Sequence, residues 1–133
     1  MHLTIWKVND VFEQSDFISI HLPLLAETYH CINNDTIKRM KNGVYIINTA
    51  RGLLVNEEAV AGALKTGKLS GFATDVYEEE PIVVNSILLS CENFICTPYL
   101  AGESYTSYRE IGNATAEGVL AILKGKKLKH RLV

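Results

Sequence analysis

Arg51 lies shortly after an apolar, β-branched run, at a position where its charge could bind a ligand. The run, Val44–Ile47, is typical of a buried parallel strand, and it ends abruptly in the polar segment 48–52, NTARG. In open α/β sheets, ligands bind outside the carboxyl ends of the strands. A guanidinium there offers a permanent positive charge and a planar fork of donors, which suits a carboxylate or a phosphate. The alternative is a surface arginine in a strand-to-helix loop.

Other reactive side chains follow further apolar runs. Asp75 lies near the end of the run Gly71–Val76, and three consecutive glutamates occupy positions 78–80. Tyr99 comes shortly after the run Phe94–Thr97. Taken alone, the run of glutamates is more typical of a solvated acidic loop than of a site, and Asp75 can be an ordinary cap at a strand end.

Predicted strands and helices alternate along the chain. Alternation implies parallel strands joined by right-handed crossovers, so the carboxyl ends of all the strands lie along one edge of the sheet. That edge collects a cation, a carboxylate and a phenol, which favours a functional site over a chance arrangement. We therefore predict an α/β fold with a parallel sheet of about four strands and flanking helices. The predicted strands are Phe17–Leu22, 44–48, Gly71–Val76 and Phe94–Thr97, and the predicted helices span 10–14, 36–41, 57–65 and about 104–123.

Several side chains have an expected structural role in this scheme. His21 is expected to fill a buried position at the end of the first strand rather than to transfer protons. Tyr105 and Tyr108 lie at helical spacing on the apolar face of the last helix and are expected to pack on the sheet. Helix caps are expected from Asn9, from Asn34 or Asp35, and from Asn56.

Composition narrows the class of protein. The chain has 133 residues, 47% of them hydrophobic, and a formal net charge of −2, which predicts one domain over residues 1–133 and gives no sign of a nucleic-acid-binding surface. No apolar run approaches the length of a membrane span, and the N-terminus has no signal-peptide pattern. The three cysteines lack metal-type spacing, so we expect free thiols, no metal site and a cytoplasmic location.

Four blocks of the sequence follow one another in a specific order: SDFISIHLPLLAETYHCIN, MKNGVYIINTARGLLVNEEAV, GFATDVYEEEP and FICTPYLAG. In order and spacing they resemble the NAD-binding domain of the D-isomer-specific 2-hydroxyacid dehydrogenases. The resemblance runs from about Ser15 to the C-terminus. It implies hydride transfer between NAD(H) and a 2-hydroxy or 2-oxo acid.

The resemblance also implies roles for individual residues. Arg51 would bind the substrate carboxylate and polarise the 2-oxo group, and Glu80 would be the acid that pairs with the family's catalytic histidine. Asp75 would hold the nicotinamide carboxamide. Tyr99 falls at the position of the catalytic histidine. Further residues expected to line the cofactor are Leu22, Pro23, Thr49, Ala50, Ala101 and Gly102.

Two departures from the family pattern are visible. A free phenol has a pKa of about 10, so Tyr99 is a poorer proton exchanger at neutral pH than the histidine that it replaces. None of the nine glycines forms the motif G-x-G-x-x-G, which in this family opens the first βαβ unit and holds the pyrophosphate. We therefore expect a partial Rossmann domain without that unit, with an exposed sheet edge near Phe17–Leu22 that favours self-association.

Two functions remain open from the sequence. The first is the cofactor domain of an NAD-dependent D-2-hydroxyacid dehydrogenase, with weak or absent NAD binding and no activity as this chain alone. The second is a non-catalytic dimerisation or interaction module derived from that family.

Overall fold

The computed structural model describes residues 4, 5 and 7–129. Contacts between residues group the chain into two compact units, Met1–Tyr99 and Leu100–Val133. The first unit holds the sheet and the second holds the last helix, and each is described by itself.

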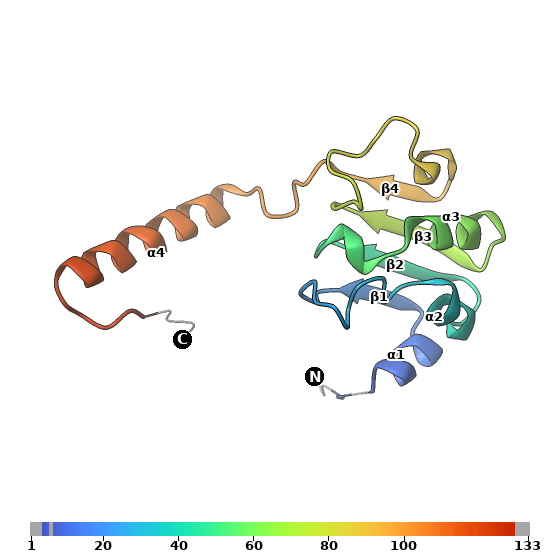
Figure 1. Ribbon diagram of the computed structural model, residues 1–133, viewed down its shortest axis with the longest axis horizontal. Coiled ribbons are helices and arrows are strands. Elements are labelled where there is room, and N and C mark those ends of the chain that lie inside the picture. Colours follow the sequence, from blue (N-terminus) through green and yellow to red (C-terminus); the bar gives the residue numbers. More distant parts are fainter. Residues whose placement is uncertain (1–3, 6, 130–133) are drawn as a thin grey trace. The chain divides into compact units, whose positions relative to one another are not determined.

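The first unit contains a four-stranded parallel sheet in the order β1-β2-β3-β4 (Figure 1). This arrangement confirms the predicted α/β fold. The strands are β1 (Phe17–Ile20), β2 (Val44–Asn48), β3 (Leu69–Thr74) and β4 (Phe94–Cys96). The helical segments are α1 (Val8–Gln14), α2 (Asn34–Arg39), α3 (Glu57–Lys65) and the 3-10 turns η1 (Gly52–Leu54) and η2 (Ile87–Ser90).

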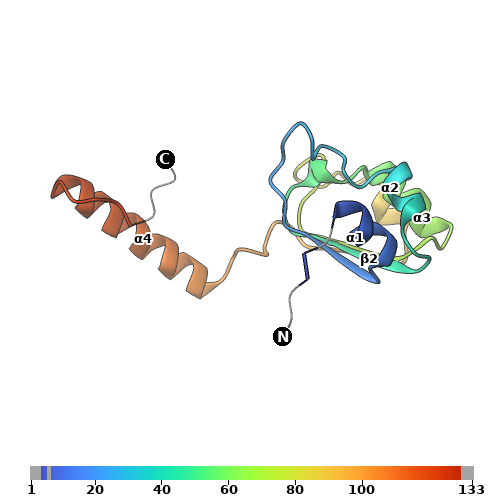
Figure 2. The same cartoon turned by 90° about the horizontal axis from the view of Figure 1, so that it is seen from below.

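The two faces of the sheet differ in burial. Helices α2 and α3 lie over the same face (Figure 2), where Ile18, Ile46 and Phe72 are buried in the hydrophobic core. On the opposite face, Phe17 and Tyr45 stack at 5.1 Å between ring centroids and remain 69% and 44% exposed. Strand alternation produces this division, because successive side chains point to opposite faces.

The helix starts agree only in part with the predicted caps. Asn56 caps α3 as predicted, accepting a hydrogen bond from Ala59 N. The cap of α2 is Asn33 rather than Asn34 or Asp35; its extended backbone lets it form a reciprocal capping box with Thr36. The prediction for Asn9 is wrong, since α1 begins after Lys7. The Asn9 side chain instead accepts a hydrogen bond from Arg39 Nη1.

The second unit is built on α4 (Tyr105–Leu123), which Ser104 caps by accepting a hydrogen bond from Ser107 N. No residue of α4 is buried. Tyr105 and Tyr108 are 82% and 60% exposed. Their packing on the sheet stays a prediction, because the sheet belongs to the first unit. Among the residues described, no helix is long and apolar enough to cross a membrane.

Candidate active site

The carboxyl ends of the four strands are in register. Ile20 pairs with Asn48, Asn48 with Thr74, and Thr74 with Cys96, so the last residues of β1 to β4 form one continuous row. The segments that follow the strands therefore begin side by side, as the sequence predicted for parallel strands. They bring Leu22, Pro23, Thr49, Ala50, Arg51, Asp75 and Tyr99 to the same edge of the sheet.

Asn48 fixes the loop that presents Arg51. Its side chain is 1% exposed, and it donates a 2.9 Å hydrogen bond to the carbonyl oxygen of Arg51. Its Oδ1 accepts a 3.1 Å hydrogen bond from the backbone N–H of Ala50. A buried amide that satisfies both its donor and its acceptor in this way determines the path of the loop.

Arg51 itself is exposed in the loop after β2. Its Nη1 donates a 2.6 Å hydrogen bond to the carbonyl oxygen of the preceding residue, Ala50. The guanidinium has further donors, so this bond leaves capacity for an anionic ligand. The neighbouring Leu22, Pro23 and Thr49 are also exposed.

Asp75 is a buried carboxylate directly after β3. It is 4% exposed, and its Oδ1 accepts a 2.5 Å hydrogen bond from the hydroxyl of Thr97, which follows β4. Its backbone N–H donates to Asn48 O at 3.0 Å, on the other neighbouring strand. Asp75 is therefore positioned by the strands on both sides.

Tyr77 organises the loop between Asp75 and Glu80. Its hydroxyl donates a 2.6 Å hydrogen bond to Thr97 O, and its backbone N–H donates to Glu80 Oε1 at 3.2 Å. Burial raises the pKa of the Tyr77 phenol to about 12, with smaller contributions from Cys96, Asp75 and Glu57. The phenol is therefore neutral near pH 7 and acts as a hydrogen-bond donor. Glu80 is exposed at the end of this loop.

The Tyr99 backbone has φ of 59°, in the left-handed region that non-glycine residues seldom adopt. Its N–H donates to Asp75 O at 3.2 Å, and its side chain is 51% exposed. Ala101 and Gly102 belong to the second unit, in the turn before α4.

His21 departs from its prediction. It is exposed, not buried, and its Nε2 lies 2.8 Å from Ser19 Oγ. The reason is that β1 ends at Ile20, so His21 lies beyond the covered part of the sheet.

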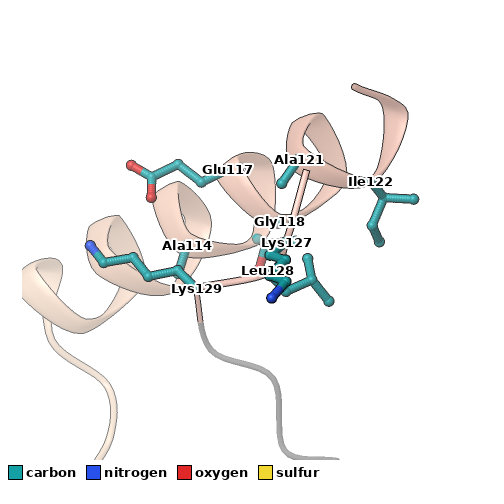
Figure 3. Close-up of a pocket in the computed structure, with 9 residues that line it drawn as sticks. Ala114, Glu117, Gly118, Ala121, Ile122, Lys127, Leu128 and Lys129 are labelled. Carbon is teal, nitrogen blue, oxygen red and sulfur yellow. The ribbon is translucent and has the colours of Figure 1, made fainter. Parts of the chain in front are cut away.

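The second unit contains a hollow of its own. Figure 3 shows it between α4 and the segment 127–129, with Gly118 and Leu128 among its lining residues. None of the predicted site residues lines it. In the described part of the chain, no group of three or more His, Cys, Asp or Glu side chains is arranged to hold a metal ion.

Most of the chain, including the strand ends described above, matches a known protein family. A family profile described as D-isomer specific 2-hydroxyacid dehydrogenase, NAD binding domain, matches residues 1–101. The chain belongs to this family. The resemblance found in the sequence is thereby confirmed.

Similar members of the dehydrogenase family include enzymes with different names. The chain is 40% identical over 119 residues to a glyoxylate reductase of Thermofilum pendens, covering 90% of this chain and 35% of the relative. It is 38% identical over 114 residues to a hydroxypyruvate reductase of Thermotoga maritima, covering 84% and 37%. The chain thus spans about a third of the length of these relatives.

A solved dehydrogenase structure shares the fold. The crystal structure of D-lactate dehydrogenase with NAD+ from Lactobacillus jensenii matches with a TM-score of 0.86 and 26% identity, covering 96% of this chain and 42% of that one. Its match supports a Rossmann-type arrangement of the parallel sheet, and the family uses NAD.

The donor set of this chain fits one part of NAD. A buried carboxylate, Asp75, can accept hydrogen bonds from an amide, and the loops after β1 and β2 offer small or apolar side chains at the same edge of the sheet. The glycine motif for the pyrophosphate does not occur in the sequence. The residues therefore fit the nicotinamide end.

Sequence reasoning did not identify four residues that hold this site together: Asn48, Thr74, Tyr77 and Thr97. A signal was available for Thr74 and Asn48, because polar residues at the ends of apolar strand runs must find hydrogen bonds when buried. Thr74, 4% exposed, donates from Oγ1 to Val76 O at 2.7 Å.

Proposed function

We propose that this chain provides the nicotinamide and substrate-carboxylate part of the active site of an NAD-dependent D-2-hydroxyacid dehydrogenase. The single observation that carries the proposal is the link between Arg51 and Asp75. The loop of Arg51 begins at Asn48, and Asp75 donates its backbone N–H to Asn48 O at 3.0 Å. A cation for an acid substrate and a carboxylate for an amide thus project from adjacent strand ends.

Each residue has a defined part in this proposal. Arg51 binds the carboxylate of a small 2-oxo acid and polarises its 2-oxo group. Asp75 accepts a hydrogen bond from the nicotinamide carboxamide. NAD(H), when bound, supplies the hydride. The cofactor is also lined by Leu22, Pro23, Thr49 and Ala50.

Reduction of the 2-oxo group also requires a proton for the developing alkoxide. Glu80 and Tyr99 are the acidic groups that we assign to this step, with Tyr99 at the position of the family's histidine. The phenol is a weaker proton exchanger than an imidazole near pH 7. We therefore propose that the chain alone has no turnover, and that the small acid is acted on only with the parts of the enzyme that this chain does not contain.

A calorimetric titration with NADH tests the binding part of the proposal. We expect saturable binding with Kd of about 1 mM, or about −4 kcal/mol. Asp75→Ala should weaken it by about tenfold. Glu79→Gln is the matched control, because Glu79 is an exposed carboxylate in the same loop. Absent binding, or equal binding by Asp75→Ala, would contradict the proposal.

A turnover assay tests whether catalysis requires the parts of the enzyme that this chain does not contain. NADH oxidation with glyoxylate, pyruvate or hydroxypyruvate should stay at the background rate for this chain alone. Turnover that depends on Arg51 would show that the chain is sufficient for catalysis.

The second candidate is a non-catalytic dimerisation module in the cytoplasm. Exposed apolar side chains favour it: Phe17 and Tyr45 on the open sheet face, and Tyr105 and Ile111 on α4. Surfaces of this kind commonly pair with another chain. Light scattering over a range of concentrations decides this candidate, and a concentration-independent monomer would exclude a homo-oligomer.

A further inference from the structure

The loop that carries Asp75 and Glu80 is also held by residues outside the proposed active site. We propose that Glu78, supported by His30, is a positioning residue that holds this loop in the geometry required for nicotinamide binding. The functional part of this inference rests on the proposed function, and the structural part can be tested separately.

Glu78 and Glu57 bind each other's backbone reciprocally. The N–H of Glu57 donates to Glu78 Oε1 at 2.9 Å, and the N–H of Glu78 donates to Glu57 Oε1 at 2.9 Å. Glu57 is the first residue of α3, so its N–H has no partner within the helix. The Glu78 carboxylate therefore satisfies a free donor at a helix N-terminus, where the helix dipole also favours negative charge.

This pairing brings two carboxylates together, and a nearby cation would reduce the repulsion between their charges. Burial raises the pKa of the Glu57 carboxyl, and the charge of Glu78 raises it further, while the hydrogen bond from Glu78 N lowers it. His30 Nε2 lies 3.3 Å from Glu78 Oε1, close enough for an ion pair when the imidazole is protonated. His30 thus offsets the like-charge repulsion in its protonated form.

The backbone holds His30 in this place. It has φ of 46°, its N–H donates to Leu53 O at 2.9 Å, and its carbonyl oxygen accepts a 2.8 Å hydrogen bond from Asn33 Nδ2. Its ring stacks on Tyr29 at 4.0 Å. A residue fixed by this many contacts in a sparsely populated conformation is a rigid support for Glu78.

The two anchors enclose a short span of chain. At one end Asp75 is bound to Asn48 O and to Thr97, and at the other Glu78 is bound to Glu57. Between them, the carbonyl of Tyr77 packs against Gly52, where an added Cβ would lie 1.7 Å from the oxygen. The Tyr77 N–H in turn donates to Glu80 Oε1. Release of Glu78 would therefore move Tyr77 and change where Asp75 and Glu80 point.

Amide hydrogen exchange and NADH titration of the full chain test the inference together. In Glu78→Ala we expect the Tyr77 amide and the amide of residue 78 to exchange at least about tenfold faster. Affinity for NADH should fall about tenfold. Glu78→Gln keeps an oxygen acceptor for Glu57 N, so it should retain most of the amide protection and most of the NADH affinity. His30→Asn, which suits the left-handed backbone, should give a smaller loss than Glu78→Ala.

Glu79→Gln is the matched control. Glu79 is exposed and makes no hydrogen bond or ion pair in the part of the chain that the structure describes. It should leave exchange and affinity unchanged. Unchanged exchange in Glu78→Ala overturns the positioning role whatever happens to NADH. Faster exchange without weaker NADH binding overturns its link to the site, whereas no NADH binding by the unmodified chain overturns the proposed function itself.

Discussion

The backbone N–H of Asp75 donates a 3.0 Å hydrogen bond to the carbonyl oxygen of Asn48 on the neighbouring strand. The same Asn48 uses its side chain to fix the loop of Arg51. One residue thus connects the predicted acid-binding cation with the predicted amide-binding carboxylate. Changes at Asn48 should consequently affect both.

Asn48→Ala should lower the free energy of unfolding by about 2 kcal/mol, because it removes a buried amide and leaves the N–H of Ala50 and the carbonyl oxygen of Arg51 without this partner. Urea denaturation measures this effect. Asn93→Ala is the control, since the side chain of the exposed Asn93 donates a hydrogen bond to Ser70 O at 3.0 Å. Its loss should stay below about 1 kcal/mol. Equal effects of the two substitutions would argue against the assigned role of Asn48.

Two glycines should respond in opposite directions to alanine. At Gly52 a Cβ would lie 1.7 Å from the Tyr77 carbonyl oxygen, so Gly52→Ala must displace backbone and should destabilise the fold by more than about 3 kcal/mol. At Gly62, inside α3, a Cβ meets nothing within 4 Å. Gly62→Ala should stabilise the fold by about 0.5–1 kcal/mol through helix propensity. Thermal unfolding of both variants checks the pair, and a tolerated Gly52→Ala would contradict the close packing.

Glu57→Gln should change stability in a pH-dependent way. Because the folded-state pKa of Glu57 is raised, its contribution is fully present below the unfolded pKa and is lost as pH rises through the folded value. Glutamine keeps the oxygen that accepts from Glu78 N and does not ionise. The variant should therefore gain stability relative to the parent over the pH range that begins at about 4, near the ordinary pKa of a glutamate. A difference that is constant over this range would be inconsistent with the raised pKa.

The three thiols should react at different rates. Cys96 is exposed, Cys91 is buried, and Cys31 is half-buried with its thiol donating to Leu54 O at 3.3 Å. Burial raises the pKa of Cys31, so less thiolate forms at a given pH. Iodoacetamide at about pH 7.5 should label Cys96 first, and labelling of Cys31 should accelerate as the pH rises. Mass spectrometry follows each site, with the urea-unfolded chain as the control for equal reactivity.

Local sequence signals were sufficient for the sheet. The apolar runs at 44–47 and 94–96 are strands in the structure, and Asn56 caps α3 as predicted. The N-cap of α2 was harder to predict, because several neighbouring residues could cap the helix. Asn33, Asn34 and Asp35 are all good caps, and only the extended backbone at Asn33 decides between them.

Contacts between distant segments could not be predicted from local patterns. Thr97 binds Asp75 across 22 residues of sequence, and Glu78 binds Glu57 across 21. Their partners depend on how loops approach one another after the sheet has formed. In the sequence, Glu78 and Glu79 are equivalent members of one acidic run, and only the geometry separates them.

The in-register row of Ile20, Asn48, Thr74 and Cys96 sets a length scale for any ligand at this edge. With neighbouring strands about 4.8 Å apart, the first and last strand ends are separated by about 14 Å. A three-carbon acid is shorter than this span and can contact only adjacent strand ends at one time. Under the proposed function, an acid held by Arg51 would leave the far ends of the row to a longer molecule. Contacts to the small substrate and to the cofactor would then divide along the row by size.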